Sequence, residues 1–302
     1  MPTVRANGID IGYEVHGAGP PVILLHGATS AGREDFAAQV PLFSRAFLVH
    51  LPDARGHATT RWDAADGFEY AWLVDDLAAF ADALGLRTFH LVGFSMGAMT
   101  ALQFAVRHPE RLRTLVVIGI TTNREPRSSV ARRLMDPDRV DRDDPAWAAE
   151  LSRRHDPVQG PGAWRRLLRA IVGDLAVQPP LTPRELHDID CPALVVAGDR
   201  DPFVPVDHAW GLARLLRHGR LLIVPDCGHE VMVHRPAIFN EALASFYRTT
   251  EAVARRRATE PEPTGAGPAE GEDAASLRHP AADAVPDIHA TDAHWLEAPE
   301  PD

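Results

Sequence analysis

The feature that most constrains this chain is the pentapeptide Gly93-Phe94-Ser95-Met96-Gly97, which has the pattern G-x-S-x-G. An apolar, β-branched run over 88–92 precedes it, and apolar residues at helical spacing follow it over 99–106. The sequence therefore predicts a strand, a sharp turn and a helix, with Ser95 on the turn. A serine in that position has strained backbone angles, and its hydroxyl stands clear of the sheet.

Short apolar runs recur along the chain and alternate with helical patterns. Residues 3–15 alternate like a hairpin, with Asn7-Gly8 as its turn. Runs typical of strands buried on both faces follow at 22–25, 46–51, 115–118, 192–197 and 221–224. Helices are predicted at 34–43, 69–84, 205–217 and 230–247. This alternation predicts an α/β fold with a mostly parallel sheet covered by helices on both faces.

The alternation stops between residues 121 and 180, where no strand pattern occurs. Helical pieces at 128–135, 145–154 and 163–175 are separated by Asp/Pro and Gly/Pro breaks. We expect this segment to be a small helical cap on a core formed by residues 1–120 and 181–250. The remainder, 251–302, is acidic and rich in Pro and Ala, which predicts a disordered C-terminal tail.

The negative charge of the chain is concentrated in its last residues. The net charge is −11, and residues 258–302 carry eleven Asp and Glu against one Arg, so the rest of the chain is nearly neutral. A neutral body gives no indication of a nucleic-acid partner. The N-terminus lacks a signal pattern and no apolar run reaches membrane length, so a soluble cytoplasmic protein with no membrane contact is expected.

Two further candidate residues follow predicted strands, at the edge where open α/β sheets bind ligands. His229 comes after the last predicted strand and is the candidate general base. Asp201 lies in the loop after 192–197 and is the candidate that orients this histidine. Asp199 is the alternative, but its place beside Gly198 favours hydrogen bonds to the backbone of the turn.

The turn His26-Gly27-Ala28 follows the first buried strand. The backbone N–H of Ala28 and that of Met96, the residue after Ser95, are predicted to form an oxyanion hole. A zinc site at His229-Glu230 is not predicted, because the second histidine of an H-E-x-x-H motif would fall on Val233. Neither a metal nor an organic cofactor is expected.

The candidate residues follow one another in the order Ser95, Asp201, His229, which is the order of α/β-hydrolases. On the motifs HGATS, DARGH, GFSMG, GDRDPFVP and DCGHE, the chain resembles the α/β-hydrolase fold family, in the branch with a helical cap after the sixth strand. The resemblance covers about residues 3–248 and implies an eight-stranded, mostly parallel sheet. The resemblance is equally close to three groups of this family: haloperoxidase/perhydrolase-like esterases, 3-oxoadipate enol-lactonases and carbon–carbon bond hydrolases.

These motifs predict a serine hydrolase that cleaves an ester or lactone of a small, mainly apolar molecule through an acyl-enzyme on Ser95. Carbon–carbon bond hydrolysis or perhydrolase-like chemistry by the same triad stays open, as does a low-turnover receptor or pseudoenzyme. The candidate pocket residues are His26, Ile120, Met135, Trp147 and Trp164. For those in the cap, packing within the cap's own core is the alternative, and the oligomeric state stays open.

Overall fold

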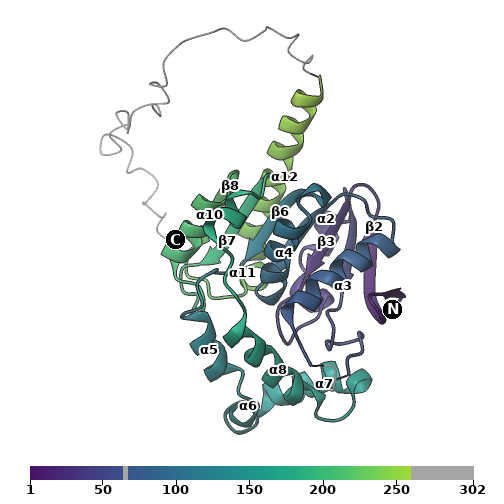
Figure 1. Cartoon of the computed structure of the whole chain (residues 1–302), viewed down its shortest axis with the longest axis vertical. Coiled ribbons are helices and arrows are strands. Elements are labelled where there is room, and N and C mark those ends of the chain that lie inside the picture. The colour runs from purple at the N-terminus through teal and green to yellow at the C-terminus, as the bar shows by residue number, and fades with distance from the viewer. Residues whose placement is uncertain (64–66, 260–302) are drawn as a thin grey trace, which may run out of the picture. The chain divides into compact units, whose positions relative to one another are not determined.

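An eight-stranded sheet runs through the middle of the protein in the order β1-β2-β4-β3-β5-β6-β7-β8 (Figure 1). The computed structural model describes residues 1–63 and 67–259, with side chains up to residue 250. The strands are β1 (Thr3–Ala6), β2 (Ile9–Gly17), β3 (Pro21–Leu25), β4 (Leu48–Pro52), β5 (Phe89–Phe94), β6 (Leu112–Ile118), β7 (Ala193–Gly198) and β8 (Gly219–Val224). Only the pairs β1–β2 and β2–β4 are antiparallel among these strands, which confirms the predicted fold.

Successive residues of the central strands face opposite sides of the sheet, and both sides are covered. Leu91 belongs to a core cluster that includes residues of α3 (Tyr70–Ala83), α4 (Met96–Arg107) and α10 (Val206–Leu215). Its neighbour Val92 belongs to a second cluster, with residues of α2 (Val40–Phe43), α11 (Val231–His234) and α12 (Pro236–Thr259). Because both faces of the sheet are buried, the sequences of the central strands are continuous apolar runs.

The helix predicted over 34–43 is instead two short helices, α1 (Gly32–Asp35) and α2. The chain leaves helical geometry at Phe36, and the Asp35 side chain turns back to accept hydrogen bonds from the loop that follows β3. Pro41 lies in the first turn of α2, where its missing N–H costs nothing.

The helix predicted over 230–247 is likewise divided, into α11 and α12. Arg235 lies between them with φ −132° and ψ 53°, outside the helical region. Pro236 follows it, and a proline disfavours helical angles in the preceding residue. α12 then continues to Thr259, so the predicted start of the tail at residue 251 falls inside this helix. Residues 260–302 lie outside the described residues.

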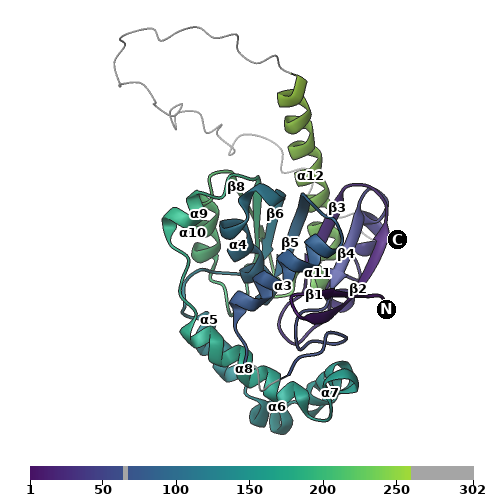
Figure 2. The same ribbon diagram turned by 45° about the vertical axis from the view of Figure 1, so that its right-hand side comes forward.

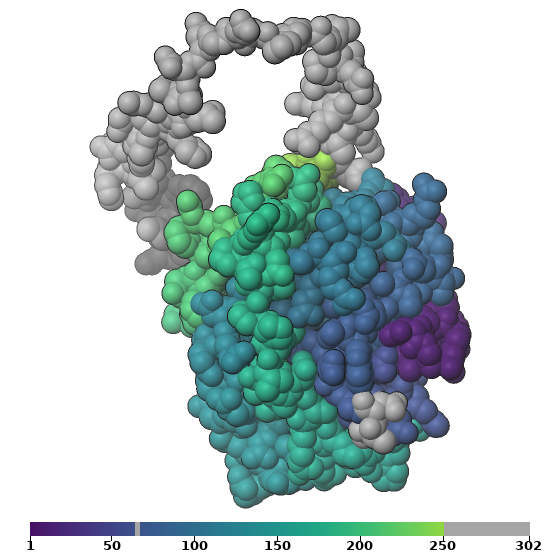
Figure 3. Space-filling model, in the orientation of Figure 1, coloured from purple at the N-terminus to yellow at the C-terminus, as the bar shows by residue number. Residues whose placement is uncertain are grey.

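Four helices follow β6 and gather at one end of the sheet (Figure 2). They are α5 (Arg127–Leu134), α6 (Pro137–Asp143), α7 (Pro145–Gln159) and α8 (Ala163–Val177). α6 was not predicted, because Asp136-Pro137 resembles a break but is the N-cap and first residue of a helix. In the space-filling view the cap makes up the lower end of the face shown (Figure 3). A short helix, α9 (Pro183–His187), leads back into β7.

Candidate active site

Ser95 lies on a sharp turn between β5 and α4, as the pentapeptide predicts. Its backbone angles are φ 50° and ψ −108°, which cost a non-glycine residue about 1–3 kcal/mol. The turn also needs its glycines, because a Cβ atom on Gly93 would lie 2.2 Å from the Gly97 carbonyl oxygen. The structure therefore maintains a strained turn whose serine lines a cavity of about 620 Å³.

Ser95 is joined to two residues from the other half of the chain. The Ser95 hydroxyl lies 2.9 Å from His229 Nε2, and His229 Nδ1 lies 2.8 Å from Asp201 Oδ2. A carboxylate only accepts, so Nδ1 carries the proton and Nε2 is free to accept from the serine hydroxyl. The histidine is thus held in the tautomer that a general base requires.

The side chain of Asp201 is fully buried, and the backbone satisfies its second oxygen. Oδ1 accepts hydrogen bonds from the N–H groups of Phe203 and Val204, at 2.8 and 3.2 Å. Asp199 does not reach His229; it accepts a hydrogen bond from the Cys227 N–H at 3.3 Å. The structure thus brings Asp201 to the histidine and gives Asp199 the backbone contact expected of it.

The imidazole of His229 is enclosed by groups to which the sequence analysis assigned no role. The rings of Phe203 and Phe94 lie with their centroids 4.5 and 5.0 Å from it. Gly119 lies against its edge, where an added Cβ would be 2.9 Å from His229 Cε1. Gly119 comes directly after β6, and that position is the sequence signal that could have indicated it.

The two amides predicted for the oxyanion hole both belong to residues that line the cavity beside Ser95. Within residues 1–63 and 67–259, the N–H groups of Ala28 and Met96 donate to no partner, whereas the neighbouring Gly97 N–H donates to the His26 carbonyl at 3.1 Å. Unpaired backbone amides are rare in proteins and are suited to a developing negative charge.

Buried side chains fix the loop that carries Ala28. Asp35 accepts hydrogen bonds from the Gly27 N–H at 2.8 Å and from the Ser30 hydroxyl at 2.5 Å. Burial raises the pKa of Asp35, although His26 and these hydrogen bonds oppose the shift. His26 bonds the Gly27 carbonyl through Nδ1 at 2.7 Å and accepts from the Ala54 N–H at 2.9 Å.

The cap helix α7 holds the same loop from the other side. The Thr29 carbonyl accepts hydrogen bonds from Arg154 Nη1 at 2.5 Å and His155 Nε2 at 3.0 Å. Thr29 itself has φ 69°, a strained angle for a β-branched residue. His155 Nδ1 accepts from the Ala58 N–H at 3.0 Å. The oxyanion loop, residues 27–30, is therefore tied directly to the cap.

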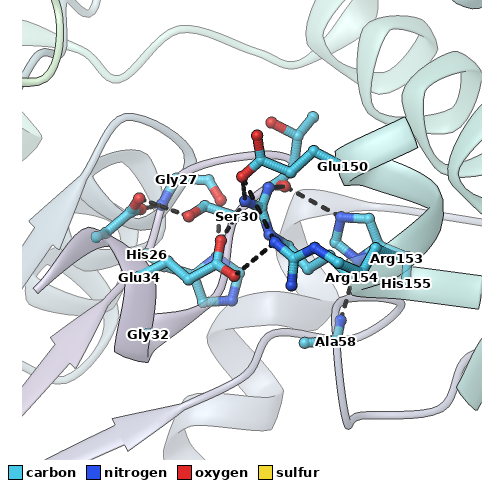
Figure 4. Close-up of polar contacts among 12 residues, drawn as sticks. His26, Gly27, Ser30, Gly32, Glu34, Ala58, Glu150, Arg153, Arg154 and His155 are labelled. Atoms are coloured by element: carbon cyan, nitrogen blue, oxygen red, sulfur yellow. Dashed lines mark hydrogen bonds and ion pairs between the residues drawn. The ribbon is translucent and has the colours of Figure 1, made fainter. Parts of the chain in front are cut away.

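Figure 4 shows this contact, with Arg154 between Glu34 and Glu150 and with His155 beside Ala58. Arg154 pairs with Glu34 of α1 and, at 2.6 Å, with Glu150 of its own helix. Burial lowers the pKa of His155 to about 4, so this histidine is neutral near pH 7. Neutrality is required, because Nδ1 acts as an acceptor.

The cavity above Ser95 has a volume of about 620 Å³ and lies between the sheet edge and the cap. Of the predicted pocket residues, Ile120, Met135 and Trp147 line it, but His26 and Trp164 do not. Trp164 is buried in the cap's own core against Leu151 and Leu168. The His26 side chain is used up by its two backbone contacts. The prediction that His26 and Trp164 line the pocket is therefore wrong.

The described residues hold no group of three or more His, Cys, Asp or Glu side chains placed to bind a metal ion. Likewise, no helix in this part of the chain is long and apolar enough to cross a membrane.

A serine, a histidine and an aspartate joined in this order on a mostly parallel sheet define the class of α/β-hydrolases. The chain belongs to the alpha/beta hydrolase family, whose model matches residues 22–242. The protein is accordingly an enzyme of the hydrolase class.

Relatives with different substrates resemble the chain about equally. A 2-hydroxy-6-oxo-6-phenylhexa-2,4-dienoate hydrolase from Comamonas testosteroni is 28% identical, covering 79% of this chain and 91% of its own. The human serine hydrolase BPHL is 26% identical, with coverages of 80% and 84%. An N-acyl homoserine lactone degrading enzyme of known structure is 27% identical with a TM-score of 0.66, covering 81% of this chain and all of its own.

Proposed function

We propose that the protein hydrolyses an ester or lactone through an acyl-enzyme formed on Ser95. The observation that carries this proposal is the continuous chain of hydrogen bonds from buried Asp201 through His229 to the Ser95 hydroxyl. This series of hydrogen bonds ends at a cavity. Ala28 and Met96 also line it, and their amides have no partner among the described residues.

In the first half of the reaction, Ser95 Oγ attacks the acyl carbon while His229 Nε2 takes its proton. The carbonyl oxygen becomes an oxyanion, which the amides of Ala28 and Met96 stabilise by about 3 kcal/mol each. Asp201 stabilises the imidazolium that forms. The tetrahedral intermediate then expels the alcohol oxygen, which takes the proton from His229, and the acyl group stays on Ser95.

In the second half, a water molecule gives a proton to His229 Nε2 and attacks the acyl carbon. The Ser95–acyl bond breaks, Ser95 Oγ takes the proton back, and the carboxylic acid leaves. A lactone follows the same course, except that its alcohol and acid remain one molecule. Every proton transfer in both halves uses His229.

The walls of the cavity favour a small and largely apolar substrate. Side chains such as Ile120, Leu134 and Phe203 make up most of its surface. The volume of about 620 Å³ is within the usual range for small-molecule sites. The lactone-degrading relative supports the assignment to esters and lactones.

Carbon–carbon bond hydrolysis by the same three residues is the second candidate. It is supported by the name of the Comamonas relative, at 28% identity. An esterase and a carbon–carbon hydrolase differ in the bond that is broken, so a panel of aryl esters, lactones and one dienoate ring-cleavage product distinguishes the two.

Replacing Ser95 by alanine tests the proposal. The Ser95→Ala variant is expected to hydrolyse a para-nitrophenyl ester at least about 10⁴-fold more slowly, because the attacking atom is lost. The melting temperature should stay close to that of the wild type. Turnover is measured by release of para-nitrophenol, and folding by circular dichroism.

The matched control is Ser245→Ala, on an exposed position of α12, which should behave as the wild type. A Ser95→Ala enzyme that keeps wild-type turnover would exclude Ser95 as the nucleophile. A wild-type protein that binds but does not turn over any ester would instead indicate a receptor or pseudoenzyme.

A further inference from the structure

Arg127, the first residue of α5, lines the cavity but has no partner for its charge. The residue is only 9% exposed, and its Nε atom is fully buried without a hydrogen bond. Its terminal nitrogens likewise form no hydrogen bond or ion pair with any residue that the structure describes. The Nε atom has thus lost its water without gaining an acceptor, which is costly, while the terminal nitrogens keep access to the cavity.

The other arginine that lines the cavity differs in this respect. Arg139 pairs with Asp143 at 3.1 Å. Two groups interact electrostatically with Arg127, namely the Tyr70 phenol and a second cation, Arg124. Arg124 is itself held by the Gln178 carbonyl at 3.1 Å. Of the two arginines that line the cavity, Arg127 is therefore the one without a partner among the described residues.

The carboxylates elsewhere in the cavity wall already have partners. Asp144 accepts a hydrogen bond from the Trp147 N–H at 3.0 Å and so caps α7. Glu230 lies 3.2 Å from His234. Burial and Arg124 lower the pKa of Arg127, but an arginine side chain stays protonated in proteins. The charge needs an anion, and the described residues do not supply one.

We propose that Arg127 binds a carboxylate of the substrate, at a site separate from the bond that Ser95 attacks. A guanidinium presents two parallel N–H groups that match the two oxygens of a carboxylate. The Tyr70 phenol, which also lines the cavity, lies close enough to interact with Arg127 electrostatically. The substrate class is then a monoester of a dicarboxylic acid, or a lactone that carries a carboxylate, on a short apolar chain.

The apolar walls agree with this class, because they would contact the chain that joins the two ends. Ala131 and Leu134 of α5 and Ile171 and Leu175 of α8 line the cavity beside Arg127. The proposal rests on the proposed function only in naming the reacting end; the anion site itself depends on Arg127 alone.

The test compares two esters of equal size, mono-para-nitrophenyl adipate and the neutral ester in which an isopropyl group replaces the free carboxylate. We expect Arg127→Met to lower the ratio of kcat/KM for the anionic over the neutral ester by about tenfold to a hundredfold, mostly through KM. Arg127→Lys should retain part of the ratio. Arg133→Met, an exposed arginine of the same helix, is the control.

An equal loss of kcat/KM for both esters would show that Arg127 only supports the fold, and unchanged kcat/KM for both esters would show that it does not bind the carboxylate. Either result overturns the proposal.

A second measurement does not depend on turnover. Calorimetry with hexanoate and the Ser95→Ala protein should show binding that Arg127→Met abolishes. If no ester is hydrolysed but this binding is found, the proposed function fails and the anion site stands. If hexanoate binds equally well without Arg127, the anion site is excluded.

Discussion

Gly119 shows how one missing side chain leaves room for the imidazole of His229. It has φ 62°, an angle that favours glycine. Any side chain at this position would meet the imidazole, with Cβ 2.9 Å from Cε1 and 3.0 Å from Nδ1. The ring is packed on its other sides by Phe94 and Phe203, so it has little room to move away.

We therefore predict that Gly119→Ala lowers kcat/KM for an aryl ester by about tenfold to a hundredfold, because a displacement of about 1 Å is enough to cost that much. The Oγ–Nε2 contact should lengthen in a crystal structure of the variant. The matched control is Gly173→Ala within α8, where an added Cβ meets nothing within 4 Å. Wild-type activity in Gly119→Ala would contradict the argument.

At the scale of elements, α7 connects the cap to the oxyanion loop through a neutral histidine. The folded-state pKa of His155 is about 4, and that of a histidine in an unfolded chain is about 6.5. Between these pH values the unfolded chain binds more protons than the folded one. The free energy of unfolding should therefore fall as the pH is lowered, by about 1.4 kcal/mol per pH unit for this residue. Burial of His90, whose pKa is also about 4, adds to the trend.

Replacing His155 by glutamine tests this link, because the amide can donate to Thr29 and accept from Ala58 but does not titrate. The slope of the unfolding free energy against pH is measured by urea denaturation from pH 4.5 to 6. It is predicted to decrease by about 1.4 kcal/mol per pH unit, which corresponds to one proton. His187→Gln, at an exposed position of α9, is the matched control. An identical slope in His155→Gln and wild type would show that His155 titrates normally.

The elements also show where sequence patterns succeed. β5 and α4 were predicted because an apolar run and a helical spacing meet at Ser95. The divisions at Phe36 and Arg235 were missed because they depend on Asp35 reaching the loop after β3 and on one proline's effect on its neighbour. Apolar periodicity indicates which face of a helix or strand is buried. It does not indicate where one side chain or one proline interrupts a helix.

At the scale of the whole molecule, the sheet and the Ser95–His229 contact follow from chain order, because parallel strands bring their carboxyl ends to one edge. The pocket does not follow in this way, since it depends on how the cap helices pack. Trp164 turned inward to the cap's core, and the unpaired Arg127 had no distinguishing pattern among the arginines of the segment. These residues can be assigned only once the cap and the sheet are seen together.

The most direct test of the central claim is to label the full-length protein with a fluorophosphonate and locate the adduct by mass spectrometry. A serine activated by its histidine is phosphonylated, while an ordinary surface serine is not. We predict one adduct, on Ser95, and its loss or strong slowing in His229→Ala. An adduct on another residue, or none in a protein that hydrolyses esters, would contradict the account.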